Sequence, residues 1–289
     1  MKTAIVLGTF DGLHAGHRAV IDKAMGFYSV AVTFDMPPKS YFTLEPQLLM
    51  QTTSRVERLK MLGIDRVDVQ HFFDVKNIEA LDYLFGLKQK YNPQRIVCGF
   101  NYRFGKDANG DTELINKFCV DNDIEFICVE PITEDKTVLS STYLRGLLRE
   151  GKVDKAATQI FGGFSFTAPV IHGDARGRTL GFPTANQQYP KEMISPKFGV
   201  YISRVTIDGN KYDAITNVGI RPTFKTNTIG CETYIKDFSS NIYGKEITTE
   251  LLKFVREEKK FSSAAELKNA ILNDIKLIEK QEEDNETNI

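Results

Sequence analysis

The chain has 289 residues, of which 42% are hydrophobic and 26% charged, so it can bury a large core and is not an intrinsically disordered protein. Its formal net charge of −1 argues against nucleic acid as a partner, although a small anion needs only a few local amides and cations. No apolar stretch approaches the ~20 residues of a membrane span, so we expect no membrane partner.

The cysteines and the N-terminus indicate a cytoplasmic protein. None of the 4 cysteines belongs to a Cys-x-x-Cys pair, which argues against a zinc or redox site, and most of them lie in apolar runs. This usage fits a reducing compartment. The first apolar run is too short and too quickly interrupted for a signal peptide.

The first half of the chain alternates strand-like runs with segments of helical periodicity, which predicts a parallel sheet covered on both faces. The strand-like runs are 3–10, 29–34, 66–72, 94–100 and 124–132, and the helical segments are 18–25, 54–63, 78–91 and 111–122. Ser54 and Glu57 predict a capping box, and Asp111 predicts an N-cap. In such sheets ligands bind beyond the carboxyl ends of the strands.

After about residue 150 the pattern becomes extended, which predicts an antiparallel barrel. A helical stretch over 143–160 is interrupted by glycines, and extended runs follow at 164–171, 199–207, 211–219, 231–238 and 247–255. The sequence Asp208-Gly209-Asn210 predicts a tight hairpin turn. Ser263 and Glu266 predict the capping box of a last helix over 263–280, followed by a frayed acidic tail.

The segment Gly8–His17, GTFDGLHAGH, follows the first predicted strand and opens the first predicted helix. Its glycines allow a close approach of the backbone to a ligand, and a helix start offers unpaired amides to a phosphate. The alternative is a glycine turn with two incidental histidines, but 2 of only 4 histidines occur here. We assign ATP and phosphate binding to Gly8, Phe10, Asp11, Gly12, His14 and His17. His-x-Gly-His is typical of nucleotidyltransferases, so His14 and His17 are also the catalytic candidates of this half.

Two further segments support a nucleotide site. Ser141, Thr142 and Arg145 place hydroxyls and a cation at a predicted helix start, where phosphate could bind, although a simple helix cap explains the hydroxyls as well. The segment 99–105, GFNYRFG, directly follows a strand. Alone it could be an aromatic-rich turn; the family resemblance described next implies that Asn101, Phe104 and Gly105 shape the flavin and nucleotide site.

In this order the three motifs resemble the FMN adenylyltransferase half of the prokaryotic bifunctional riboflavin kinase/FAD synthetase family. The resemblance implies that His14 and His17 contact the ATP phosphates, and that Ser141, Thr142 and Arg145 hold the phosphate tail or pyrophosphate. One departure is Pro37, which stands where the family carries a hydrogen-bonding side chain after the second strand.

The second half contains a glycine-rich basic segment, Gly173–Asn186, that ends in Pro-Thr-Ala-Asn. Glycine amides and arginine can hold phosphates, and the Thr184 hydroxyl and Asn186 carbonyl are hard oxygen ligands suited to Mg²⁺. The alternative is a flexible basic turn. The ATP-binding candidates are Gly177, Arg178, Gly181, Pro183, Thr184 and Asn186, with Thr184 and Asn186 as the metal ligands.

This segment resembles riboflavin kinases, and the resemblance continues through 198–201, 217–224, 231–234 and 254–256. It implies that Glu232 is the catalytic carboxylate and that Glu232 and Arg256 contact the flavin. A carboxylate suits the chemistry, because the 5′-hydroxyl of riboflavin is a poor nucleophile. An outward-facing glutamate on a strand is the alternative.

Together the resemblances cover about residues 5–278 and imply two domains. Residues 1–158 would form an α/β nucleotidyltransferase domain with a Rossmann-like parallel sheet, and residues 159–289 a riboflavin kinase-like barrel with a terminal helix. The implied substrates are ATP, riboflavin and FMN, with Mg²⁺ as cofactor and FAD as product. We expect a monomer or weak homo-oligomer. Two other possibilities are a flavin-binding protein without catalysis and an adenylyl- or cytidylyltransferase for another substrate.

Overall fold

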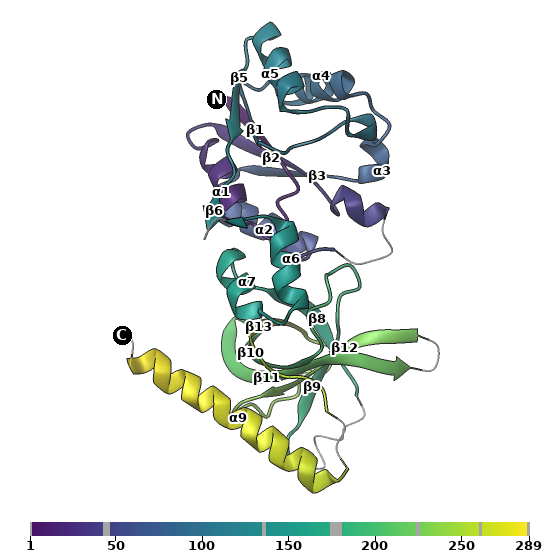
Figure 1. The fold of residues 1–289 in the computed structure, drawn as a ribbon, viewed down its shortest axis with the longest axis vertical. Helices are drawn as coiled ribbons and strands as arrows, with labels where there is room; N and C mark the ends of the chain where they lie inside the picture. Colours follow the sequence, from purple (N-terminus) through teal and green to yellow (C-terminus); the bar gives the residue numbers. More distant parts are fainter. Residues whose placement is uncertain are drawn as a thin grey trace. The chain divides into compact units, whose positions relative to one another are not determined.

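The computed structural model describes residues 2–42, 47–134, 137–173, 181–223, 226–259 and 262–287. Its chain forms two compact units, Met1–Leu144 and Arg145–Ile289 (Figure 1). Within the described residues, no helix is both long and apolar enough to cross a membrane.

The first unit is built on a five-stranded sheet in the order β3-β2-β1-β4-β5, with every neighbouring pair parallel. This confirms the predicted parallel sheet. Four consecutive residues of the central strand, Ala4–Leu7, are buried, as expected for a strand covered on both faces. The strands are β1 (Thr3–Leu7), β2 (Tyr28–Phe34), β3 (Arg66–Gln70), β4 (Arg95–Gly99) and β5 (Glu125–Val129).

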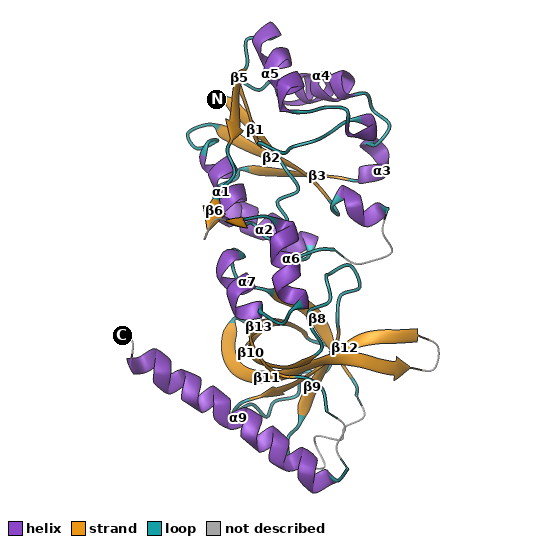
Figure 2. Ribbon diagram, in the orientation of Figure 1, coloured by secondary structure: helices purple, strands orange, loops and turns teal. Residues whose placement is uncertain are grey.

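Helices cover both faces of this sheet (Figure 2). On one face Ile5, Leu7 and their neighbours pack with α4 and α5 in a single apolar core. On the other face α1 contacts β4 and β5, and α2 contacts β3. The helices are α1 (Ala15–Asp22), α2 (Thr52–Met61), α3 (Phe72–Val75), α4 (Ala80–Tyr91) and α5 (Thr112–Asp121).

One of the two predicted helix starts in this unit is correct. Asp111 caps α5, since its carboxylate accepts a hydrogen bond from Leu114 N at 2.9 Å. The capping box at Ser54 is wrong, because α2 already begins at Thr52. The Thr52 hydroxyl donates to the carbonyl of Asp35 at 2.7 Å, a long-range contact that local sequence does not reveal.

A small two-stranded sheet, β6 (Thr133–Glu134) and β7 (Thr137–Val138), precedes the helical stretch predicted over 143–160. That stretch is two helices, α6 (Ser141–Arg149) and α7 (Val153–Gln159). Between them Gly151 has a φ of +82°, a left-handed conformation that glycine adopts without the strain of a Cβ. Within the second unit α7 packs against β13.

The second unit is a closed barrel with the strand order β10-β11-β12-β9-β8-β13, and all its pairs are antiparallel. The predicted barrel is thus confirmed. Its interior contains a chain of hydroxyl hydrogen bonds, 2.7 Å from Ser203 to Thr216 and 3.0 Å from Thr216 to Thr233. The strands are β8 (Ser165–Ile171), β9 (Thr184–Gln188), β10 (Gly199–Ile207), β11 (Asn210–Thr223), β12 (Thr226–Ile235) and β13 (Glu246–Arg256).

Local sequence predicted the hairpin turn of this unit correctly, missed one strand and placed the end of the terminal helix too early. The hairpin turn is confirmed, because Asp208 and Gly209 connect β10 to β11 with φ values of +49° and +83°. Strand β9 was not among the predicted strands, since its polar residues have low strand propensity. The terminal helix α9 (Ala264–Thr287) continues through most of the segment predicted to fray.

Candidate active sites

The glycine-rich loop of the first unit lies at the topological switch point of its sheet. Strand β1 pairs with β2 on one side and β4 on the other, so the order reverses beside β1. The loops that follow β1 and β4 therefore leave the same edge of the sheet, where ligands bind in open α/β folds. The motifs beginning at Gly8 and Gly99 are these two loops.

The loop after β1 is held in an unusual conformation. Phe10, Gly12 and Leu13 have φ values of +50°, +89° and +44°, and both apolar side chains are fully buried. A Cβ on Gly12 would lie 2.8 Å from Leu49 Cδ1, and one on Gly8 would lie 3.0 Å from the Phe10 ring. Such strain persists only where the surroundings enforce it, and it is concentrated at functional sites.

The two histidines lie together at the start of α1. Their rings stack with centroids 3.9 Å apart and an interplanar angle of 25°. His14 occupies the N-cap position with 7% of its surface exposed, and His17 lies in the first helical turn. A Cβ on Gly16 would lie 3.1 Å from the His14 ring, so glycine allows that ring to lie across the helix start. Two imidazoles therefore adjoin the N-terminus of a helix, toward which the first backbone N–H groups of that helix point.

Asp11 holds this loop from inside. Its carboxylate is fully buried and accepts a hydrogen bond from Leu49 N at 2.8 Å. Its carbonyl accepts one from the Ser141 hydroxyl, also at 2.8 Å. Because a carboxylate repels phosphate, this geometry favours a positioning role for Asp11 over direct contact with ATP.

The Ser-Thr-Arg segment forms the start of α6. Ser141 is tied to the β1 loop through Asp11, whereas Thr142 is exposed. Arg145 follows one turn later on the same helix, but beyond the division between the two units. Two of the three predicted side chains are thus located within the first unit.

The loop after β4 has a buried and an exposed part. Phe104 is 4% exposed and belongs to the apolar core, where its ring stacks on Tyr102 with centroids 5.7 Å apart. Gly105 has a φ of +71°, and a Cβ there would lie 2.7 Å from Ala80 Cα. Asn101 is exposed. Phe104 and Gly105 therefore anchor the loop, and Asn101 is the member that a ligand can reach.

Sequence reasoning missed a polar cluster at the carboxyl end of β2. The Asp35 carboxylate accepts a hydrogen bond from Tyr41 Oη at 2.5 Å and lies 3.6 Å from His71 Nε2. The fully buried Arg55 donates from Nη2 to the carbonyls of Phe34 and Asp35. Burial lowers the pKa of Arg55, and the charges of Asp11 and Asp35 oppose that shift. The position of Asp35 directly after the predicted strand 29–34 was the one sequence feature that could have indicated this cluster.

In the second unit, one row of facing residues runs across five barrel strands. Asn186 on β9 faces Glu232 on β12, and Glu232 faces Asn217 on β11. The row continues to Val200 on β10 and Arg256 on β13. Directly opposed residues on antiparallel strands project to the same face. The flanking residues Cys231 and Thr233 are buried inside the barrel, so the row lies on its outer face.

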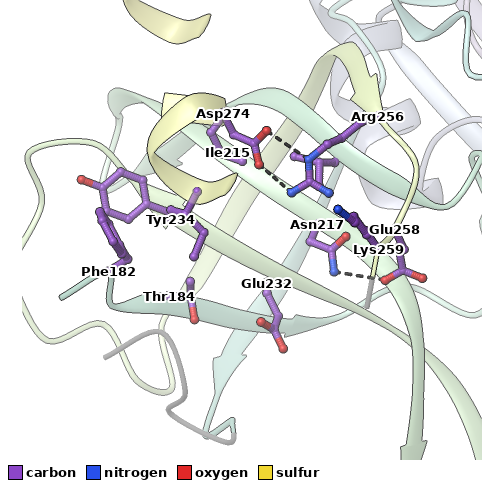
Figure 3. Close-up of a pocket in the computed structure, with 12 residues that line it drawn as sticks. Phe182, Thr184, Ile215, Asn217, Glu232, Tyr234, Arg256, Glu258, Lys259 and Asp274 are labelled. Atoms are coloured by element: carbon purple, nitrogen blue, oxygen red, sulfur yellow. Dashed lines mark hydrogen bonds and ion pairs between the residues drawn. The ribbon is translucent and has the colours of Figure 1, made fainter. Parts of the chain in front are cut away.

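A cavity of about 140 Å³ opens on this outer face, beneath α9 (Figure 3). It brings together Thr184, Glu232 and Arg256, three of the predicted site residues. Ile271 and Asp274 line it from α9, and α9 contacts β11. The other lining residues are Phe182, Val200, Ile215, Asn217, Tyr234, Glu258 and Lys259.

Thr184 and Asn186 lie two residues apart on β9, next to Glu232. Asn186 is 4% exposed, and in the described part of the chain its Oδ1 is buried and accepts no hydrogen bond. A Cβ on Gly173 would lie 2.4 Å from that oxygen, so glycine allows a close backbone approach. An orphaned amide oxygen and a threonine hydroxyl, two residues apart on one face of β9, are hard ligands that fit a cation such as Mg²⁺. The described ranges contain no cluster of three His, Cys, Asp or Glu side chains that could hold a metal.

Arg256 is held by the terminal helix. Its Nε and Nη2 donate to the two carboxylate oxygens of Asp274 at 3.1 and 2.7 Å, a bidentate ion pair (Figure 3). The Asp274 side chain is only 7% exposed. Sequence reasoning identified Arg256 but not Asp274, because nothing local marks one aspartate of an amphipathic helix.

The remaining ATP-binding candidates are only partly described. Gly181, with a φ of +88°, and the exposed Pro183 lead into β9. Gly177 and Arg178 lie outside the described residues.

Comparison with known proteins assigns a family to each half. Residues 1–143 match the model of the FAD synthetase family, and residues 162–281 match that of the riboflavin kinase family. The chain is 32% identical to the bifunctional riboflavin kinase/FMN adenylyltransferase of Listeria monocytogenes, over 98% of this chain and 91% of the relative. It is also 32% identical to the Bacillus subtilis enzyme of the same description, over 94% of this chain and 90% of that enzyme.

A solved structure described as a macrolide-efflux protein from Streptococcus pneumoniae is also similar. The two structures superpose with a TM-score of 0.85 at 30% sequence identity, over 96% of this chain and 93% of the chain of that structure. Its described activity differs from that of the curated relatives, and we ascribe no efflux to this chain.

Proposed function

This chain belongs to the family of bifunctional riboflavin kinase/FMN adenylyltransferases, and from that premise we propose which residues perform its two reactions. The chain is an enzyme of flavin cofactor synthesis. It phosphorylates riboflavin to FMN with ATP, and it transfers AMP from ATP to FMN to give FAD and pyrophosphate. The observation that carries the residue assignment is the convergence of Glu232, Thr184 and Arg256 on one cavity.

In the adenylyltransferase half, a phosphate oxygen of FMN attacks the α-phosphorus of ATP. A new P–O–P bond forms, the α–β phosphoanhydride bond breaks, and pyrophosphate leaves. His14 and His17, with the amides at the start of α1, donate hydrogen bonds to phosphate oxygens as charge develops. The buried contacts of Asp11 support this role, because they hold the loop in place before the substrates bind. We propose that Ser141, Thr142 and Arg145 bind the phosphate tail.

In the kinase half, Glu232 accepts the proton of the riboflavin 5′-hydroxyl as that oxygen attacks the γ-phosphorus of ATP. The β–γ phosphoanhydride bond breaks and ADP leaves. The apolar lining from Val200, Ile215 and Ile271 suits a flavin ring. Arg256, oriented by Asp274, is the proposed polar contact to that ring.

We propose that Thr184 and Asn186 hold the Mg²⁺ that accompanies ATP in the kinase half. When bound, the ion neutralises charge on the phosphate oxygens. The orphaned Oδ1 of Asn186 and the neighbouring Thr184 hydroxyl support this assignment. Glu232 lies directly opposite Asn186 in the strand register and lines the cavity together with Thr184, which supports a proton acceptor close to the proposed phosphate site.

Incubation of the purified enzyme with riboflavin and Mg-ATP is expected to yield FMN first and FAD later. The reason is that one chain contains both activities. Chromatography of the flavins over time measures both steps. If FMN accumulated and FAD never formed, the adenylyltransferase assignment would fail for this chain. Pro37 would then be the first residue to test, because it replaces a hydrogen-bonding side chain of the family.

Thr184→Val is expected to raise the KM for Mg-ATP and lower the rate of phosphorylation, each by about 10-fold or more, because it replaces a metal ligand with a side chain of similar size. Phosphorylation measured across a Mg²⁺ titration tests this. The adenylation of added FMN by the same variant is the control and should be unchanged. A variant with a wild-type Mg²⁺ dependence would rule out Thr184 as a ligand.

The remaining proposals concern organisation. We propose that the two activities reside in residues 1–158 and 159–289, that the enzyme is a monomer or weak homo-oligomer, and that it is cytoplasmic. Separate compact cores in the first and second units support the modular arrangement. Analytical ultracentrifugation of the full chain tests the oligomeric state.

A further inference from the structure

Asn217 lies beside the proposed base and begins the segment 217–224 of the family resemblance, which by itself implies no role for this residue. It lies directly opposite Glu232 in the β11–β12 register and lines the same cavity (Figure 3). Its Nδ2 donates to Glu258 Oε1 at 3.1 Å. Within the described ranges, its Oδ1 is buried and accepts no hydrogen bond. A buried amide oxygen without a donor is costly, which makes this atom a candidate for ligand contact.

Glu258 determines which way the carboxamide points. A carboxylate can only accept hydrogen bonds, so the NH₂ group of Asn217 must face Glu258. The carbonyl oxygen then faces the opposite direction. Hydrogen-bond chemistry therefore assigns the orientation of this amide. Asn217 Oδ1, which points away from Glu258, can only accept a hydrogen bond.

Gly219 makes this arrangement possible. It lies two residues after Asn217 on β11, so both positions belong to the same face of the strand. A Cβ at Gly219 would lie 2.0 Å from Glu258 Oε1 and 2.4 Å from its Cδ. Any other residue would displace the carboxylate that orients Asn217.

We propose that Asn217 is a specificity-determining residue of the kinase, and that its Oδ1 accepts a hydrogen bond from a ribityl hydroxyl next to the reacting 5′ end, with Glu258 as its positioning residue. This inference rests on the proposed role of Glu232. The kinase would then recognise the polyhydroxy chain of the flavin as well as its ring.

The location of Asn217 selects the ribityl chain as its partner. Opposed Cβ atoms on antiparallel strands are about 4.5–5.5 Å apart, so a group bound by Asn217 lies near the hydroxyl that Glu232 deprotonates. The carbon atoms beside the 5′ position of riboflavin carry hydroxyls, which can donate to an acceptor. The ring of riboflavin offers a single N–H donor, on the side away from the ribityl chain.

Asn217→Leu tests the proposal, because leucine has a similar size and makes no hydrogen bonds. Phosphorylation is measured with riboflavin, 4′-deoxyriboflavin and 3′-deoxyriboflavin. With riboflavin we expect kcat/KM to fall by about 10–100-fold. With the analogue that lacks the recognised hydroxyl, the variant and the wild type should have nearly equal kcat/KM. Asn217→Ala, measured in parallel, covers the case in which leucine disturbs the strand.

Glu258→Ala and its neighbour Glu257→Ala form a matched pair. Glu257 pairs with Lys197 at 2.9 Å and does not line the cavity. We expect E258A to reduce the preference for riboflavin over the deoxy analogue by about 3–10-fold, and E257A to leave it unchanged. Thermal unfolding of each variant shows that the barrel is intact.

Equal losses of kcat/KM for riboflavin and both analogues would overturn the proposal, as would a loss confined to the KM for ATP. Either outcome would leave the kinase assignment itself standing. Failure of the wild-type enzyme to phosphorylate riboflavin would instead contradict the proposed function.

Discussion

Glu232→Gln is expected to lower the rate of riboflavin phosphorylation by about 10²–10⁴-fold, with little change in riboflavin affinity. Glutamine keeps the shape of the side chain but cannot accept the proton of the 5′-hydroxyl. Because Glu232 faces the cavity from the outer face of the barrel, the substitution does not change the side chains packed in the barrel interior. Steady-state phosphorylation and flavin binding, measured separately, test the expected difference between rate and affinity.

The matched control is Glu246→Gln, an exposed carboxylate at the start of β13 that does not line the cavity. This variant should phosphorylate riboflavin at the wild-type rate, and both variants should adenylate added FMN normally. Wild-type phosphorylation by E232Q would remove Glu232 as the base. Glu258 and Asp274 would then be the cavity carboxylates to examine.

The second large loss of activity is expected for FAD formation when His14 or His17 is replaced. Replacing His14 or His17 with alanine should lower FAD formation from FMN by about 10²–10³-fold, because each variant loses a preorganised donor to phosphate oxygens. The stacked arrangement of the two rings predicts a further result. The double variant should lose less than the product of the two single losses, since each ring helps to orient the other.

Phosphorylation of riboflavin by the same histidine variants is the internal control and should remain nearly unchanged. The reason is that the proposed kinase residues all lie in the second unit, which has its own core. Equal losses of both activities would contradict two separate sites. Full FAD synthesis by H14A and H17A would remove the histidines from the mechanism.

Local sequence predicted some elements well, for a physical reason. Apolar periodicity reports which face of a strand or helix is buried, so the five parallel strands and most of the barrel strands were predicted correctly. The turn at Asp208-Gly209 follows from the φ > 0 preference of those two residues. The predicted helix start at Ser54 was wrong because α2 begins at Thr52, whose hydroxyl makes a hydrogen bond to Asp35 that local sequence does not reveal.

For the candidate sites, sequence alone identified the chemical groups, and the fold determined which other residues lie next to them. The motifs containing His14, Thr184 and Glu232 were recognisable as residue types at fixed spacing. Nothing local indicated that Glu232 would face Asn186 on one side and Asn217 on the other.

The burial of Arg55, the Arg256–Asp274 pair and the orientation of Asn217 by Glu258 also came only from the tertiary structure. Periodicity and turn chemistry act over a few neighbouring residues, so sequence by itself determined most of the strands, the hairpin turn and the candidate site motifs of this protein. Strand register and helix docking join positions tens of residues apart, and they alone decided which side chains share a cavity.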